Sequence, residues 1–146
     1  MQGIPEEEKI YWSSFRYAYE QGLCVADIYQ RLYQKMERMG VFSVRQYEIL
    51  EKPPFVPLCI DYLGDNIYAL SQNPVIDDQL VADPDMEIRV DHTRRTAEPL
   101  SLQDPSGRRV VYPAPDRVDL VAKNDLARFL NSWLDGLLAQ GFIRHQ

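Results

Sequence analysis

The spacing of apolar residues changes twice along this chain of 146 residues, and this change restricts the fold more than any single motif. Up to Gly40 apolar side chains recur every three or four positions, from about residue 44 to 112 they alternate with polar ones, and from 124 to 141 the helical spacing returns. A repeat near 3.6 is typical of an amphipathic helix, and a repeat of 2 is typical of a half-buried strand. Helices, then a run of strands, then a helix predict an α+β protein rather than a parallel sheet.

The segment 1–40 predicts two helices. The first begins at Pro5 and ends at Gly22, and the second has its apolar residues spaced by three and four and ends at Gly40. The first helix carries more aromatic side chains than one face can bury: Tyr11, Trp12, Phe15, Tyr17 and Tyr19. We expect it either to lie between two packed layers or to offer Tyr11, Trp12 and Tyr19 to another protein or to a second copy of the chain.

The segment 44–112 predicts an antiparallel sheet of about five or six strands. Its clearest strand alternates Met86, Ile88 and Val90 with charged residues, so we expect one face on the core and one in water. Turn residues at 64–66 and 104–107 predict short connections between neighbouring strands. The aspartate-rich segment 74–85 predicts a loop.

The segment 124–141 predicts a helix packed across one face of the sheet. Asn124 is expected as its N-cap and Gly141 as its left-handed end, with Phe142 folding back onto Leu137. The hydrophobic fraction of 45% is enough for one core in a chain of this length. We therefore expect a single domain over 1–146: two N-terminal helices, the sheet and the C-terminal helix.

Charge and targeting signals predict an acidic cytoplasmic protein. The net charge is −6, of which each half of the chain carries −3. A surface of this sign repels phosphate backbones and anionic lipids, so we expect neither a nucleic-acid partner nor a membrane. Glu6, Glu7 and Glu8 stand where a secretory signal would be basic. The two cysteines, Cys24 and Cys59, cannot build a disulfide framework and indicate a reducing compartment.

Motifs that carry chemistry are missing from the sequence. The glycines form neither a phosphate-binding loop nor a dinucleotide fingerprint, and no serine lies in a nucleophile elbow. The pairs Asp77 with Asp78 and Asp83 with Asp85 fit a solvated loop better than a cation site. We expect no catalytic residue, no metal and no cofactor, and an enzyme is the less favoured class.

One local cluster of charged and titratable residues lies at the end of the clearest strand. His92, Arg94 and Arg95 could bind a carboxylate or a phosphate, with Asp91 orienting the histidine ring. Arg109 would join them if the following hairpin folds back far enough. The alternative is an ordinary charged turn. This cluster is the place where a small anionic ligand, or the substrate of a weak hydrolase, is expected.

Roughly residues 55 to 141 resemble a known family, and the closing segment carries the clearest pattern. A Tyr-Pro loop leads into a helix of the pattern FLxxWLxxxLxxG, at Tyr112, Pro113, Phe129, Leu130, Trp133, Leu134, Leu138 and Gly141. In this pattern the chain is similar to the YqiB-like family of uncharacterised bacterial proteins. The resemblance implies a bacterial origin and the same closing strand pair and helix, and it implies no activity.

Two functions remain in view. The first is a non-enzymatic protein-interaction or assembly module, because a catalytic constellation is missing and the first predicted helix has surplus aromatic residues. The second is a binder of a small anionic ligand at the His92 cluster.

Overall fold

A computed structural model describes residues 25–145, and the first predicted helix, with Tyr11, Trp12 and Tyr19, lies outside these residues. The elements of the described part, in chain order, are α2 (Val25–Met39), the short 3-10 helix η1 (Val41–Ser43), β1 (Tyr47–Leu50), β2 (Leu58–Gly64), β3 (Ile67–Gln72), β4 (Val75–Ile76), β5 (Gln79–Leu80), β6 (Asp85–Asp91), β7 (Thr96–Asp104), β8 (Gly107–Val110) and α3 (Leu120–Gln140).

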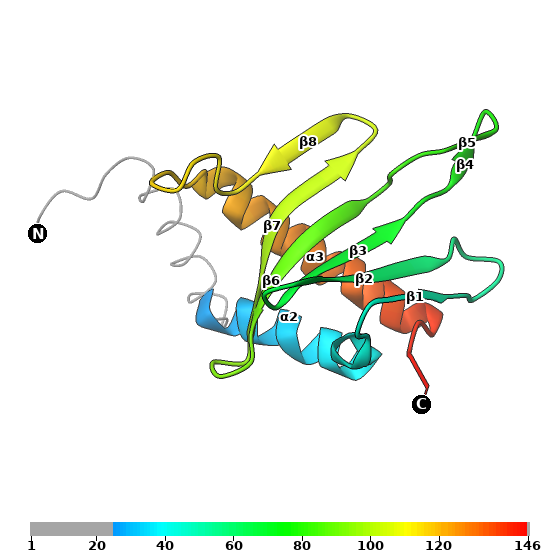
Figure 1. The fold of residues 1–146 in the computed structure, drawn as a ribbon, viewed down its shortest axis with the longest axis horizontal. Coiled ribbons are helices and arrows are strands. Elements are labelled where there is room, and N and C mark those ends of the chain that lie inside the picture. The colour runs from blue at the N-terminus through cyan, green and yellow to red at the C-terminus, as the bar shows by residue number, and fades with distance from the viewer. Residues whose placement is uncertain (1–24, 146) are drawn as a thin grey trace, which may run out of the picture.

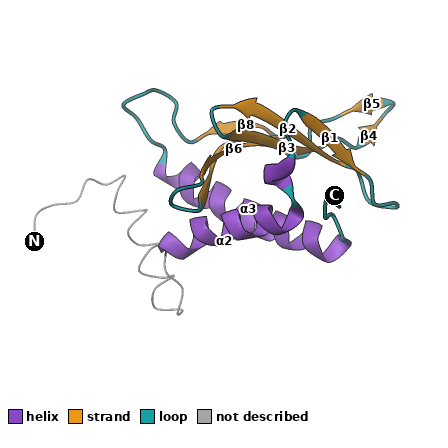
Figure 2. Ribbon diagram, turned by 60° about the horizontal axis from the view of Figure 1, so that its bottom comes forward, coloured by secondary structure: helices purple, strands orange, loops and turns teal. Residues whose placement is uncertain are grey.

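The main layer is a six-stranded antiparallel sheet in the order β1-β2-β3-β6-β7-β8. Both described α-helices lie side by side on one face of this sheet (Figures 1 and 2). The predicted α+β class, the antiparallel sheet and the C-terminal helix across one face are confirmed. We call the face without helices the open face.

The core lies between the sheet and the two helices. In β6, Met86, Ile88 and Val90 are almost fully buried, and the residues between them face the open side, as the alternation predicts. Strands β2 and β3 and both helices complete the layer with Leu58, Ile60, Leu70, Leu32, Met36, Leu126, Leu130 and Leu134. The open face therefore carries every second residue of each strand.

The connection between β2 and β3 is the tight turn that the sequence predicts. Asp65 and Asn66 both have positive φ angles, of 53° and 59°. Two successive residues in this region define the turn whose twist matches that of a hairpin, and short polar side chains tolerate it.

The structure corrects the prediction of a loop at residues 74–85. This segment contains a small hairpin, β4 and β5, with Asp77 and Asp78 at φ angles of 52° and 63°. These aspartates are turn residues for the same reason as Asp65 and Asn66. Each strand has only two residues, so the sequence shows no repeat long enough to indicate a strand.

The structure also corrects the predicted start of α3. Its N-cap is Asp119, five residues before the predicted Asn124, and the Asp119 carboxylate accepts a hydrogen bond of 2.9 Å from the Ala122 amide. The predicted end is confirmed: Gly141 has a φ angle of 91°, and the amide of Phe142 donates to the carbonyl of Leu137. Among the described residues, no helix combines the length and apolarity needed to cross a membrane.

Candidate functional site

The turn between β6 and β7 holds three of the four residues predicted to bind a ligand. His92 leaves the strand on the helix side, where its Nδ1 is hydrogen-bonded to the hydroxyl of Tyr33 at 2.9 Å. The ring also meets Phe42 edge-on, with 5.0 Å between centroids. The histidine is thus oriented by Tyr33 of α2, and not by Asp91 as the sequence suggested.

The two arginines of this turn point in different directions. The backbone amide of Arg94 donates to the Asp91 carboxylate at 3.0 Å, and its side chain is 83% exposed. Arg95 donates to Glu37 of α2 at 2.8 Å, and its guanidinium lies over the Tyr33 ring at 5.0 Å. Arg95 is therefore occupied with α2, and Arg94 is the more available cation of the pair.

Arg109 is separated from this turn. Strand β8 pairs with the far end of β7, where Arg109 lies opposite Leu102, so about six residues of extended chain, or about 20 Å, separate it from Thr96. Its guanidinium donates to Asp125 of α3 at 3.2 Å. The structure does not bring Arg109 together with His92 and Arg94.

A shallow hollow of about 470 Å³ lies beside the turn. His92 and Arg94 line it together with Arg89, Asp91 and Glu98. The lining mixes both signs of charge, and Arg89 and Arg94 each have a carboxylate partner. The hollow can hold a small polar molecule, and an anion there competes with Asp91 and Glu98 for the guanidinium groups.

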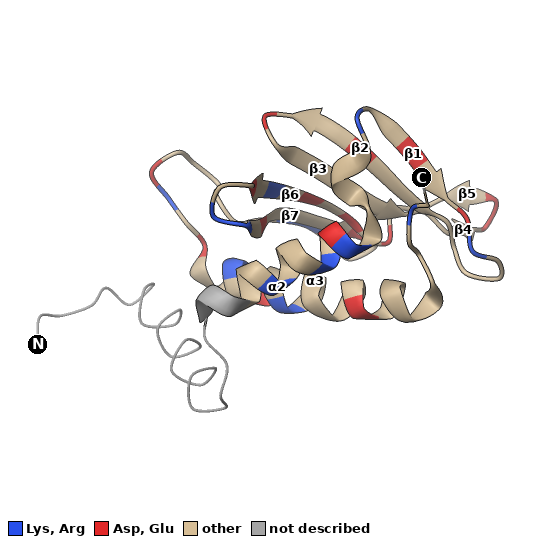
Figure 3. Ribbon diagram, turned by 90° about the horizontal axis from the view of Figure 1, so that it is seen from below, with Lys and Arg blue, Asp and Glu red and all other residues tan. Residues whose placement is uncertain are grey.

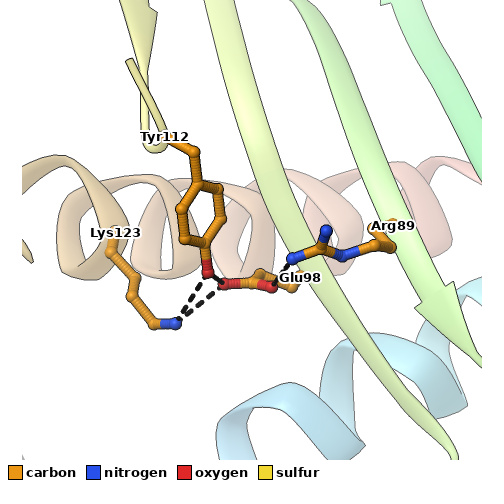
Figure 4. A network of polar contacts seen from close by, with 4 residues as sticks. All are labelled: Arg89, Glu98, Tyr112 and Lys123. Carbon is orange, nitrogen blue, oxygen red and sulfur yellow. Dashed lines mark hydrogen bonds and ion pairs between the residues drawn. The ribbon is translucent and has the colours of Figure 1, made fainter. Parts of the chain in front are cut away.

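Next to the hollow, four side chains form a polar network that the sequence did not indicate (Figure 4). The carboxylate of Glu98 on β7 accepts hydrogen bonds from Lys123 of α3 at 2.8 Å, from Arg89 of β6 at 3.0 Å and from the hydroxyl of Tyr112. Lys123 also donates to the Tyr112 oxygen at 3.1 Å. The network ties two strands, the segment after β8 and the first turns of α3 to one carboxylate.

The electrostatics of the network keep each group in its ordinary ionisation state. Burial acts to raise the pKa of Glu98, but the hydrogen bonds from Lys123 and Tyr112 outweigh it, and the pKa lies below its ordinary value. Burial acts to lower the pKa of Lys123, but the bond to Glu98 outweighs it and the pKa is raised. Burial and then the bond to Glu98 raise the pKa of Tyr112. These directions are those of an ion pair that keeps its charges beside a neutral hydroxyl, and we call the network the clamp because it joins two strands to α3.

One signal for the network existed in the sequence. A short turn after Asp91 fixes the register of β6 against β7, and that register places Arg89 opposite Glu98. The sequence pattern predicted no strand at residues 96–99, so this pair was missed. Lys123 was missed because the helix was expected to begin after it.

A second surface lies at the other end of the sheet, on the small hairpin. We call Val75, Ile76 and Leu80 the apolar hairpin, and they are 67%, 47% and 74% exposed. Figure 1 shows β4 and β5 extending past the end of the main sheet. Large aliphatic side chains with this exposure contribute little to a core.

Negative charge is concentrated around this hairpin. Residues 53–88 contain seven acidic residues and no lysine or arginine. In Figure 3, β4 and β5 carry acidic residues at their turn, whereas the β6–β7 turn and the helices also carry basic ones. The even division of charge between the two halves of the chain concealed this segment, because residue 73 falls in the middle of it.

Two carboxyl groups on the open face have raised pKa values. Burial, followed by the charges of Glu87 and Asp61, raises the pKa of Asp85. Burial also raises the pKa of Asp61.

Within the described residues, no three histidine, cysteine or acidic side chains are grouped as ligands of a metal ion.

The comparison with protein families places most of the chain in a family of unknown function. A family model described as a domain of unknown function (DUF6908) matches residues 27–143, so the chain is a member of that family. The match does not support the YqiB-like naming that the pattern in residues 112–141 suggested. No curated protein and no solved structure matches the chain.

Proposed function

We propose that this protein is a protein-interaction module that binds its partner through the apolar hairpin. The carrying observation is the exposure of Val75, Ile76 and Leu80 at the end of the sheet. Val75 and Leu80 are register partners and so lie on one face of the hairpin, with Ile76 on the other. Exposed apolar side chains grouped in this way are typical of interaction sites in soluble proteins.

The hairpin is held in place by backbone contacts instead of by these side chains. The ladder between β3 and β6 continues into it through hydrogen bonds from Gln72 to Pro84 at 2.9 Å, from Asp83 to Gln72 at 3.0 Å and from Val81 to Pro74 at 3.0 Å. The aliphatic side chains are thus presented by a defined backbone. A surface ordered before binding loses less conformational entropy when it binds.

A cross-linking experiment tests the location. The photoreactive residue p-benzoylphenylalanine replaces Leu80, and in a matched variant it replaces Leu63, which is 53% exposed near the β2–β3 turn. In cells that naturally produce the chain, we expect one discrete adduct from position 80, which is lost when Val75 and Ile76 are changed to serine. The same adducts from both positions, or none from position 80, contradict the proposal.

The N-terminal aromatic residues stay a second predicted contact surface for another protein or a second copy. Light scattering on the full chain, with and without Trp12→Ser and Tyr19→Ser, measures whether they hold two copies together. If the variants have the same mass in solution as the native chain, these aromatic residues do not hold a homo-oligomer together. A bacterial, cytoplasmic and non-enzymatic role belongs to the same proposal.

The hollow beside the β6–β7 turn supports a second candidate function, the binding of a small anionic ligand. The favouring observation is that Arg89, His92 and Arg94 line one cavity of about 470 Å³. A thermal-shift screen of phosphorylated metabolites tests it, since a ligand at about 100 times its Kd adds about 2.7 kcal/mol. Arg94→Ala should abolish the shift, and Arg109→Ala, outside the hollow, should preserve it. A shift that survives Arg94→Ala contradicts this site.

A further inference from the structure

We infer that the partner of the apolar hairpin is a protein segment whose apolar residues are flanked by lysine or arginine. This inference rests on the proposed function, and it adds the chemistry of the partner. It follows from the charges that surround the exposed aliphatic side chains.

The negative charge of the whole chain resides in residues 53–88. Seven of the 22 acidic residues lie in this segment and none of the 16 basic ones does. The remainder has 15 acidic and 16 basic residues and a net charge of +1. This segment comprises β2 to β5 and the first half of β6, so the imbalance is local in space as well as in sequence.

The acidic residues of this segment form no ion pair with a described residue, although the charge of Arg108 acts on Asp85 and partly offsets the rise in its pKa. The ion pairs in the described part of the chain use Asp91, Glu37, Glu48, Glu98, Asp125 and Asp135, all of which lie outside residues 53–88. Six carboxylates elsewhere in the sheet and helices form ion pairs within the protein. The carboxylates of Asp77, Asp78 and Asp83 at the hairpin form none with a described residue and are available to a partner.

These carboxylates lie next to the aliphatic side chains. Asp77 and Asp78 form the turn between Ile76 and Gln79, so each is directly bonded to a residue of an exposed strand. Asp83 and Asp85 stand where the hairpin joins β6. The surface is therefore apolar at its centre and acidic at its edges.

A partner with the complementary arrangement gains at both places. Apolar groups at the centre bury the hairpin aliphatics, and cations at the rim meet unpaired carboxylates and speed association. An anionic lipid surface meets the same carboxylates with repulsion, which disfavours a membrane as the occupant.

A peptide selection tests the inference on the full chain. The probe is a phage-displayed library of random peptides of about 12 residues, which span up to about 40 Å when extended. We expect the selected peptides to combine apolar residues with flanking lysine or arginine. For synthetic copies of them, raising NaCl from about 0.05 M to about 1 M should weaken binding by about tenfold or more, because the Debye length falls to about 3 Å.

Matched variants assign the two contributions. Leu80→Ser should weaken binding by about tenfold, and Leu63→Ser should not. Asp77→Asn with Asp78→Asn should weaken binding several-fold at low salt and little at high salt, because asparagine keeps the positive φ of the turn. Asp65→Asn makes the same chemical change in the other tight turn and should have no effect.

The outcomes separate the inference from the proposed function. Peptides that need Leu80 but are uncharged or acidic, or whose binding ignores salt, overturn the basic partner and leave the interaction surface standing. Peptides that bind Leu80→Ser as well as the native chain overturn both. Binding of the chain to vesicles of anionic lipid, lost in Leu80→Ser, also overturns the inference.

Discussion

The clamp around Glu98 and the apolar hairpin use charge in opposite ways. In the clamp, one carboxylate accepts hydrogen bonds from Arg89, Tyr112 and Lys123, and both Glu98 and Lys123 keep only about a fifth of their side chains exposed, 19% and 20%. At the hairpin, none of the four aspartates between residues 77 and 85 forms an ion pair with a described residue. The first arrangement fixes the relative position of strands and helix. The second leaves charge unneutralised beside apolar surface.

The difference teaches where stability and binding are located. Charges paired inside the protein have little left to offer a binding partner, and removing one member of such a pair destabilises the fold because the other stays buried without it. Charges left unsatisfied slightly destabilise the fold and attract a partner of opposite sign. Variants on the two sides should therefore change different quantities, and four predictions test this.

The largest effect is expected at the clamp. Glu98→Ala leaves the Lys123 ammonium half-buried without its carboxylate and should lower the free energy of unfolding by about 2 to 3 kcal/mol. Urea denaturation of both proteins measures the change. Asp125→Ala removes the more exposed ion pair with Arg109, which also joins α3 to the sheet, and should cost less than about 1 kcal/mol. Equal costs for the two variants would show that the clamp is an ordinary surface pair.

A smaller loss is expected where α3 begins, because this start positions Lys123 for the clamp. Asp119→Ala removes the carboxylate that caps the Ala122 amide and should cost about 1 kcal/mol. Asn124→Ala, at the N-cap expected from sequence, should cost nothing, because the residue lies inside the helix and alanine is the better helix former. Thermal unfolding compares the two, and the reverse order of stability contradicts the assignment of Asp119.

The contrast between Asp119 and Asn124 shows what sequence reasoning can reach. Long repeats predicted β6, the core face of α3 and the end of that helix at Gly141, because each depends on local spacing or on one turn residue. The prediction of the N-cap was wrong because the helix begins earlier, and Leu120 and Ala122 of its first turn are also buried. The small hairpin was not predicted because strands of two residues show no repeat.

The candidate surfaces depend on contacts that local patterns do not contain. Glu98 and Lys123 are 25 residues apart, and they meet only because the segment after β8 returns along β7 and leads into α3. His92 and Arg94 were predicted together and do line one hollow, since they share a turn. Arg109 was assigned to them on an assumed hairpin register, and the observed register places it elsewhere.

A gain in stability is expected on the acidic side. Burial, then Glu87 and Asp61, raise the pKa of Asp85, so the folded protein binds this proton more readily than the unfolded chain does. Ionised Asp85 therefore costs stability above its native pKa, and the cost vanishes as the pH falls through that pKa toward 3.8. Asp85→Asn should stabilise the protein at pH 7 by about 0.5 kcal/mol, and this gain should shrink as the pH falls.

Glu98 provides the control of opposite sign for that titration. Its pKa is lowered, so its stabilising effect is present above 4.5, its ordinary value, and is lost as the pH falls through the native pKa. Urea denaturation from pH 7 to pH 3 measures the free energy of unfolding of each variant. That of Glu98→Ala should be lower than the native value at pH 7, that of Asp85→Asn should be higher, and both should approach the native value as the pH falls. Parallel curves for Asp85→Asn would show that its charge costs the fold nothing.

The smallest change in stability is expected where the largest change in binding is expected. Leu80→Ser removes an aliphatic side chain that is 74% exposed, so the free energy of unfolding should stay within about 0.5 kcal/mol of the native value. Leu70→Ala, in the adjoining strand β3 and fully buried, should cost about 2 to 5 kcal/mol and shows that the measurement detects a lost leucine. A cost of more than 1 kcal/mol for Leu80→Ser means that the hairpin aliphatics serve the fold. In that case a loss of peptide binding in this variant no longer identifies a contact surface, and the contrast between clamp and hairpin fails.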